Sequence, residues 1–159
     1  MLTFISFVNI IVLKRTADTL LLMRGISKFY DTFLEEPRRR YSLSQIEVKI
    51  LSFLSNNPDK DTAAEISYIR MLPKGNVSQA VDALIKKGFI LRIIDEHDKR
   101  KYHLKLTEKS VEITEDINQA NDAYVEYVYQ GFSAEEMELY MQMNQKILKN
   151  VLKGLEVKL

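Results

Sequence analysis

The sequence predicts a mainly α-helical protein with one small antiparallel β-hairpin. Residues 76–88 form an amphipathic helical pattern that ends in a glycine. Two short strand patterns, residues 90–94 and 102–106, follow that helix and flank a charged turn. Five glycines and three prolines in 159 residues favour long helices over many turns. A helix that leads into such a hairpin has the outline of a winged helix-turn-helix.

The composition of the chain excludes several classes of protein. The chain is 46% hydrophobic, enough for one domain with a buried core. It has no cysteine, which excludes disulfides, zinc fingers and thiol redox sensing. Both histidines, His97 and His103, lie in the hairpin, and no glycine-rich phosphate loop or nucleophile motif is found. We therefore expect no enzyme, no cofactor and no metal.

The charge is unevenly distributed, although the net charge is only +1. Residues 1–73 hold 10 basic and 8 acidic side chains, residues 74–107 hold 8 and 4, and residues 108–159 hold 5 and 10. Phosphate would attract the middle segment and repel the last one. The helix and hairpin are thus the candidate surface for nucleic acid.

The first thirteen residues are uncharged and are followed by Lys14 and Arg15. This stretch is too short to span a bilayer, and it has no basic region before it and no cleavage site after it. We expect a buried helical extension; a membrane anchor, a misassigned start and an uncleaved signal are the alternatives. Its apolar residues lie on nearly all sides of a helix, so we expect a partner chain to cover it.

Residues 17–34 predict an amphipathic helix that ends at the sequence Glu35-Glu36-Pro37. We expect the three arginines that follow, Arg38, Arg39 and Arg40, to lie in a loop. Contact with backbone phosphate is their expected functional use, in preference to contact with bases.

Two capping boxes open the next helices. Ser44 with Glu47 begins a helix that ends near Pro58, and Thr62 with Glu65 begins a shorter one that reaches about residue 71. The sequence Leu72-Pro73-Lys74-Gly75 then ends the second helix and sets the angle of the third helix. These three helices form the expected core of the DNA-binding lobe.

The third helix has an apolar stripe and a polar face. The stripe consists of Val77, Val81, Leu84 and Ile85. The outer face carries Asn76, Ser78, Gln79, Asp82 and Lys86. Asn76, Ser78 and Gln79 are the candidates for reading bases, because short amides and hydroxyls suit base edges. Lys74 and Lys86 suit phosphate, while Lys86 and Lys87 are equally well explained as ordinary exposed lysines.

Two long helices are expected after the hairpin. Thr107 is the expected cap of a helix to about residue 129, and Gly131 ends it. Ser133 with Glu136 forms a third capping box for a helix to about residue 155. Both helices have apolar faces that need a partner surface, within the chain or between chains.

The segment around the third helix resembles the MarR family of bacterial transcriptional regulators. The resemblance rests on four motifs in the same order and spacing as in the family, and Ser110 replaces the final glycine of the last. These motifs read Val77-Ser78-Gln79-Ala80-Val81-Asp82, Lys86-Lys87-Gly88, Asp98-Lys99-Arg100 and Leu106-Thr107-Glu108-Lys109-Ser110. A looser likeness runs from about residue 20 to the end.

The resemblance implies a division of the chain and a role for the hairpin. Residues 1–40 and 108–159 would form a helical dimerisation domain, and residues 41–107 a DNA-binding lobe. In the hairpin turn, or wing, Asp98 would orient Arg100 into the minor groove. Lys99 and Lys101 would contact the DNA backbone. His97 would make binding mildly pH-dependent, unless it is a solvated loop histidine without a role.

The resemblance further implies a cytoplasmic homodimer that acts as a repressor on a pseudo-palindromic operator, with no membrane partner. A small aromatic or phenolic effector would release it. Tyr30, Phe33, Tyr41, Tyr68 and Tyr124 would line the effector pocket, although aromatic residues at helical spacing are more often core. A winged-helix module that binds protein instead of DNA is the alternative.

Overall fold

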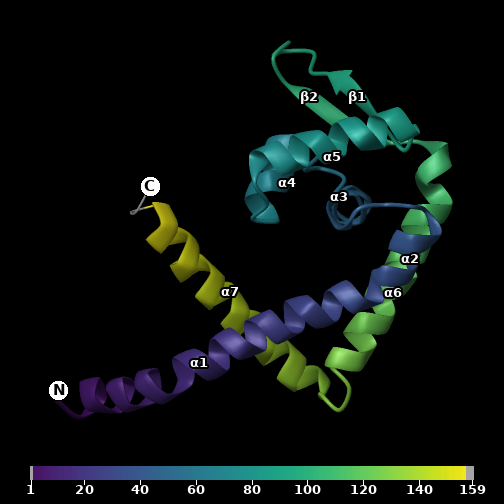
Figure 1. The fold of residues 1–159 in the computed structure, drawn as a ribbon. Helices are drawn as coiled ribbons and strands as arrows, with labels where there is room; N and C mark the ends of the chain where they lie inside the picture. The colour runs from purple at the N-terminus through teal and green to yellow at the C-terminus, as the bar shows by residue number, and fades with distance from the viewer. Residues whose placement is uncertain (1, 157–159) are drawn as a thin grey trace. The chain divides into compact units, whose positions relative to one another are not determined.

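The computed structural model describes the backbone of residues 2–156 and the side chains of residues 18–155. By its internal contacts the chain divides into two units, Met1–Ala123 and Tyr124–Leu159. The elements are α1 (Leu2–Phe33), α2 (Glu35–Arg40), α3 (Gln45–Asn56), α4 (Ala63–Ile69), α5 (Lys74–Lys87), β1 (Ile90–Ile94), β2 (Tyr102–Leu106), the 3-10 helix η1 (Glu108–Ser110), α6 (Val111–Val128) and α7 (Ala134–Glu156) (Figure 1). The boundary between the units falls within α6.

Helix α1 is a single helix of 32 residues. The amphipathic helix expected over residues 17–34 and the helical extension expected before it are therefore continuous. The expected burial of the side chains of residues 1–13 lies outside the described side chains.

The expectation of a loop at Arg38–Arg40 is wrong, because these residues form the last turn of helix α2. Pro37 is tolerated because it lies in the first turn, where a backbone N–H has no partner within the helix. Glu35 and Glu36 in the first turn and the arginines in the last turn both complement the helix dipole. The charge order thus favours a helix despite the proline.

The capping boxes of α3 and α4 are confirmed. Ser44 Oγ accepts the N–H of Glu47 (3.2 Å), and the Glu47 carboxylate accepts the N–H of Ser44 (2.6 Å). Thr62 and Glu65 make the same exchange at the start of α4 (3.3 and 3.1 Å). Each box gives partners to backbone N–H groups that the first turn of a helix leaves without one.

Helix α5 begins at Lys74, two residues before the expected start, and Pro73 precedes it. Gly88 ends it with φ 78°, the left-handed conformation expected of a glycine at this place. The expected apolar stripe packs inward, with Val77, Val81 and Leu84 fully buried. Full burial of a side chain of this size contributes about 1.5–3 kcal/mol, so this stripe fixes which face of α5 remains outside.

The core of the first unit is formed around α3, α5 and the base of the hairpin. The buried apolar residues are Leu34, Leu43, Val48, Ile50, Leu51, Phe53, Leu54, Ile66, Val77, Ala80, Val81, Leu84, Phe89, Ile90, Leu104, Ile113 and Ile117. Ile113 and Ile117 of α6 belong to this core.

Strands β1 and β2 pair antiparallel, with Ile90 opposite Leu106 and Ile94 opposite Tyr102. Figure 1 shows the hairpin beside α5. At the other edge of β2, the N–H of Leu104 donates to the carbonyl of Asp61 (2.7 Å). The linker between α3 and α4 therefore holds the middle of β2.

Thr107 does not cap α6 as expected, because no side-chain cap bond forms there. Its hydroxyl instead donates to the carbonyl of Gly88 (2.8 Å), and η1 precedes α6. Thr107 thus joins the end of β2 to the end of α5.

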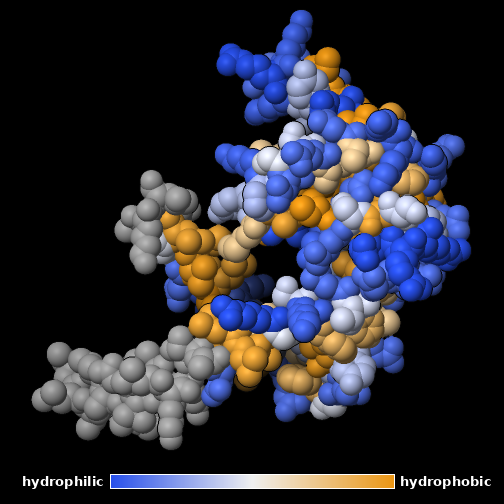
Figure 2. Space-filling model, viewed as in Figure 1, coloured by the Kyte–Doolittle hydropathy of each residue, from blue (hydrophilic) through white to orange (hydrophobic). Residues whose placement is uncertain are grey.

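In the second unit, Gly131 has φ 83° at the turn before α7. The expected capping box of α7 is confirmed by hydrogen bonds between Ser133 and Glu136 (2.8 and 3.2 Å). Apolar side chains along α7 are exposed, and Figure 2 shows hydrophobic residues gathered along this helix. They include Leu139, Met141, Met143, Ile147, Leu148, Val151 and Leu155.

Candidate nucleic-acid interface

The outer face of α5 is exposed along its length. Asn76, Ser78 and Gln79 lie on this face near the start of the helix, and Lys74 precedes them. Lys86 lies on the same face near the end. The buried stripe of α5 therefore leaves amide, hydroxyl and ammonium groups facing outward, as predicted.

Lys87 differs from its neighbour Lys86. Its ammonium donates to the Glu47 carboxylate (2.7 Å) and to the carbonyl of Ser42 (3.0 Å). Burial tends to raise the pKa of Glu47, but the hydrogen bonds from Lys87 and Ser44 outweigh it and hold this pKa below its usual value. Lys87 thus fixes the end of α5 to the start of α3, a contact that the sequence alone does not predict.

A second ion pair joins α5 to the hairpin. The Arg92 guanidinium lies 2.8 Å from the Asp82 carboxylate and 5.5 Å from the centre of the Tyr102 ring. Sequence reasoning missed Arg92, because no local spacing rule relates a helix residue to a strand residue ten positions later.

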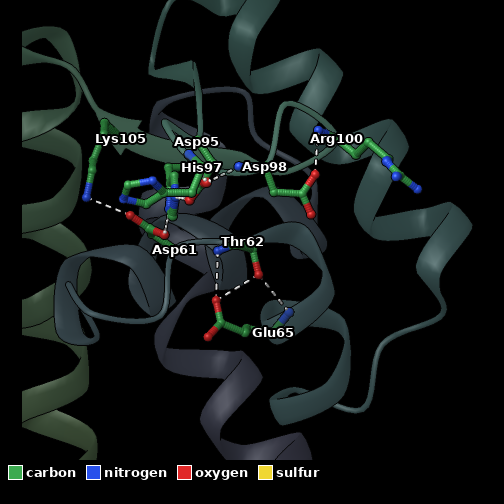
Figure 3. A network of polar contacts seen from close by, with 9 residues as sticks. Asp61, Thr62, Glu65, Asp95, His97, Asp98, Arg100 and Lys105 are labelled. Carbon is green, nitrogen blue, oxygen red and sulfur yellow. Dashed lines mark hydrogen bonds and ion pairs between the residues drawn. The ribbon is translucent and has the colours of Figure 1, made fainter.

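The wing turn is held by two aspartates. Asp95 Oδ1 accepts the N–H groups of His97 (2.8 Å) and Asp98 (2.7 Å). Asp98 Oδ1 accepts the backbone N–H of Arg100 (3.1 Å). In Figure 3 the Arg100 side chain extends away from this network. Asp98 therefore binds the backbone of Arg100, whereas the resemblance implied that it orients the guanidinium.

His103 lies between two carboxylates, an arrangement that sequence reasoning missed. Its Nδ1 is 2.5 Å from Asp61 Oδ1, and its Nε2 is 2.8 Å from Asp95 Oδ2. Lys105 Nζ donates to the other oxygen of Asp61 (2.6 Å; Figure 3). The hydrogen bonds to Asp61 and then Asp95 raise the pKa of His103. The His103 hydrogen bond, with the two turn amides, lowers the pKa of Asp95.

A hollow of about 690 Å³ lies between the start of α4 and the hairpin. Its lining includes Thr62, Arg92, Arg100, Tyr102 and His103. None of the five aromatic residues proposed for an effector pocket lines it.

Those five aromatic residues lie in different surroundings. The Tyr30 hydroxyl donates to Asn121 (2.8 Å), and the ring of Phe33 packs edge-on against Phe29 (5.0 Å). The Tyr41 hydroxyl donates to Asp116 (2.8 Å); burial and this hydrogen bond raise the pKa of Tyr41 to about 12. Tyr68 is 64% exposed, and Tyr124 belongs to the second unit.

The three arginines of α2 differ in their partners. Arg38 forms an ion pair with Glu35, and Arg40 pairs with Asp116 (2.7 Å) and Glu112 (3.2 Å). Arg39 is exposed. Neighbouring carboxylates thus offset the charge of Arg38 and Arg40.

Two further properties concern only the part of the chain that the structure describes. No group of three or more histidine, cysteine, aspartate or glutamate side chains there is arranged to hold a metal ion. In the same part, no helix has both the length and the apolar character needed to cross a membrane.

The comparisons with known proteins match this geometry. Residues 41–101 match the sequence profile of the MarR family. A MarR-family transcriptional regulator from Silicibacter pomeroyi has a TM-score of 0.74 at 21% identity, over 84% of this chain and 89% of its own. The MarR protein from Peptoclostridium difficile DA00132 has a TM-score of 0.72 at 25% identity, over 84% and 87%.

A third similar structure is that of MepR from S. aureus, solved as a complex with DNA. It has a TM-score of 0.69 at 21% identity, over 82% of this chain and 94% of MepR. These likenesses confirm the expected fold, which is mainly helical with a two-stranded wing.

Proposed function

Through residues 41–101 this chain belongs to the MarR family, and on that premise we propose that it binds double-stranded DNA sequence-specifically to regulate transcription. One observation carries the proposal: α5 presents amides and hydroxyls outward beside a wing that carries Lys99, Arg100 and Lys101. Members of this family are transcription regulators and not enzymes, so the expectation that the chain is not an enzyme holds.

The start of α5 would read base edges in the major groove. Residues at the start of a recognition helix lie deepest in the groove, which favours Asn76, Ser78 and Gln79. Gln79 suits an adenine edge, because its amide both donates and accepts. These three side chains would supply the sequence preference.

Basic residues around α5 would contact the DNA backbone. Lys74 and Lys86 flank the reading face, and Lys99 and Lys101 flank Arg100 in the wing. Arg100 would enter the minor groove, where a narrow, negative channel favours arginine. Among the arginines of α2, Arg39 is the best candidate for phosphate, because Arg38 and Arg40 have carboxylate partners.

The protein would act as a homodimer. The exposed apolar side chains of α7 form a surface that water disfavours and a second chain would cover, and Leu20–Met23 of α1 form another such surface in the first unit. Two α5 helices of a two-fold dimer would enter successive major grooves about 10 bp apart, so the operator would be a pseudo-palindrome.

Regulation would follow from the spacing of the two α5 helices. A small aromatic or phenolic effector that binds one spacing more tightly than another would release a cytoplasmic repressor from its operator. In the first unit, Tyr30, Phe33, Tyr41 and Tyr68 remain the candidates for contact with such an effector.

Selection from a random pool of DNA duplexes with residues 1–159 tests the proposal. The expected product is a two-fold symmetric sequence whose half-sites lie about 10 bp apart. A pool that stays unenriched over several rounds would contradict the proposal and favour a winged-helix module that binds protein.

A further inference from the structure

His103 connects three parts of the DNA-binding lobe. It belongs to β2, its Nδ1 faces Asp61 in the linker before α4, and its Nε2 faces Asp95 at the start of the wing turn. The three side chains are part-buried: 33% of the His103 side chain, 11% of Asp61 and 22% of Asp95 remain exposed. The contacts are therefore sheltered from solvent but reachable by protons.

The geometry specifies the protonation state of the imidazole. Each ring nitrogen lies within hydrogen-bond distance of a carboxylate oxygen, and a carboxylate at neutral pH only accepts. A neutral imidazole carries one N–H and an imidazolium carries two. Only the imidazolium satisfies both contacts, because loss of either proton turns a nitrogen lone pair toward a carboxylate.

Other charges surround this cluster. Lys105 belongs to β2, as His103 does, and its ammonium donates to Asp61 (2.6 Å). Further charged side chains lining the adjoining hollow are Asp59, Glu65, Arg92, Arg100 and Lys101. Lys105 competes with His103 for Asp61, so Asp95 is the carboxylate that depends most on the imidazolium.

The cluster continues into the wing through hydrogen bonds. The Asp95 carboxylate that faces His103 also accepts the backbone N–H groups of His97 and Asp98. Asp98 in turn accepts the N–H of Arg100. A continuous chain of hydrogen bonds thus runs from the α3–α4 linker through His103 to the residue expected in the minor groove.

We propose that His103 is a positioning residue that holds the wing turn in its DNA-binding geometry only while its imidazole is protonated. The inference rests on the proposed DNA-binding function and adds a control by pH to the same surface. Protons would favour the DNA-competent wing, and alkaline conditions would loosen it.

The direction of the pH dependence follows from the pKa shifts of the His103 imidazole and the Asp95 carboxylate. The raised pKa of His103 means that its stabilising contacts are fully present below its unfolded pKa of about 6.5 and are lost as pH rises through the folded value. The lowered pKa of Asp95 means that its contribution is present above about pH 3.9 and is lost only in acid. The contacts of both His103 and Asp95 are therefore fully present between about pH 3.9 and about pH 6.5.

The first test measures the imidazole directly. The chain has only two histidines, so nitrogen-15 NMR of the protein without DNA resolves His103. We expect the His103 imidazole to titrate above the ordinary histidine value of about 6.5 and to carry two N–H groups below its midpoint. Asp95→Asn should lower the His103 midpoint. A midpoint at or below about 6.5 in the original protein would overturn the proposed role of the protonated imidazole.

The second test links the protonation of His103 to DNA binding. Affinity for a duplex recovered by selection is measured by fluorescence anisotropy from about pH 6 to about pH 9, on either side of the ordinary histidine pKa. At the acid end, His103→Gln should bind on the order of tenfold more weakly than the original protein, the equivalent of one hydrogen bond to a charged group. The difference should shrink as pH rises.

The possible outcomes separate the two proposals. Parallel pH profiles of the original protein and His103→Gln would overturn the positioning role while leaving DNA binding intact. Failure to bind any duplex would overturn the proposed function and the role of the wing in it. The NMR titration decides the protonation of His103 in either case.

Discussion

Asp82 on the outer face of α5 is paired with Arg92 on β1 at 2.8 Å. The pair joins the helix expected in the major groove to the hairpin expected beside it. It also places a cation next to the carboxylate on that face of α5, where phosphate would otherwise repel a negative charge. Arg92 in turn lies over the Tyr102 ring, which restricts its position.

Arg92→Ala should weaken DNA binding more than it weakens the fold. Both side chains are largely exposed, 64% for Asp82 and 40% for Arg92, so the ion pair contributes only about 0–1 kcal/mol to stability. The Asp82 carboxylate left behind would repel DNA. Anisotropy titrations and thermal melts of Arg92→Ala and of Asp82→Asn/Arg92→Ala check this. Recovery of affinity in the double variant is expected, and equal losses in both would refute the role of charge.

Lys87→Met should destabilise the protein by about 2–3 kcal/mol, because it leaves the Glu47 carboxylate, only 5% exposed, without its ammonium partner. Urea unfolding measures the change. Lys86→Met is the matched control: the same substitution at the exposed neighbour should change stability by no more than about 0.5 kcal/mol. In DNA binding the order should be reversed: Lys86→Met should lower the affinity more than Lys87→Met does. Equal stabilities would contradict the role of Lys87.

The Glu47–Lys87 contact also has a pH signature. Because the pKa of Glu47 is lowered in the folded protein, its contribution is present above the unfolded value of about 4.3 and is lost as pH falls through the folded value. Lys87→Met should remove this part of the acid sensitivity in urea unfolding at several pH values.

Arg100→Ala should lower DNA affinity by about 1–3 kcal/mol and leave the oligomeric state unchanged. The guanidinium extends away from the hydrogen bonds that hold the wing turn, so its removal keeps the backbone contact with Asp98. Arg100→Lys should restore only part of the affinity, since an ammonium is more strongly hydrated and fits the groove less well. Undiminished binding by Arg100→Ala would remove the wing from the interface.

Gln79→Ala should change the preference at one base pair in each half-site by about 1–3 kcal/mol. Lys74→Ala, at the same end of α5, should instead weaken binding to all sequences alike. Repeating the selection with both variants distinguishes base reading from phosphate contact. A uniform loss with Gln79→Ala would reassign this residue to the backbone.

Leu148→Glu should weaken the dimer, because it places a charge in the exposed apolar surface of α7 that a second chain is expected to cover. Asn150→Glu introduces the same charge two residues away as a control. Removal of residues 1–15 should also reduce dimer stability. Sedimentation velocity over a concentration series measures all three. A monomeric original protein, or no effect of Leu148→Glu, would contradict the proposed dimer surface.

Local signals explain which features could be predicted from the sequence. The Ser44–Glu47 and Thr62–Glu65 boxes and the Gly88 end of α5 each depend on residues at most a few positions apart. The apolar stripe of α5 then determined its outer face, so the exposure of Gln79 followed from periodicity alone.

Features that depend on distant partners were not predictable in the same way. The pairing of Lys87 with Glu47, and of His103 with Asp61, joins residues about forty positions apart. Thr107 was expected to cap α6 but bonds to Gly88, because the end of α5 lies beside it in space. The α2 helix was missed because Pro37 was read as a breaker, although a proline is tolerated in a first turn.

We propose above that α5 and the wing bind a specific DNA sequence. The most direct test is the mobility shift of the purified protein on its own upstream intergenic DNA, titrated in salt with unrelated competitor DNA present. We expect a shift that survives the competitor and weakens steeply as salt rises, because lysines and arginines displace counterions from phosphate. An affinity equal to that for competitor DNA, on this fragment and on a duplex recovered by selection, would contradict the claim.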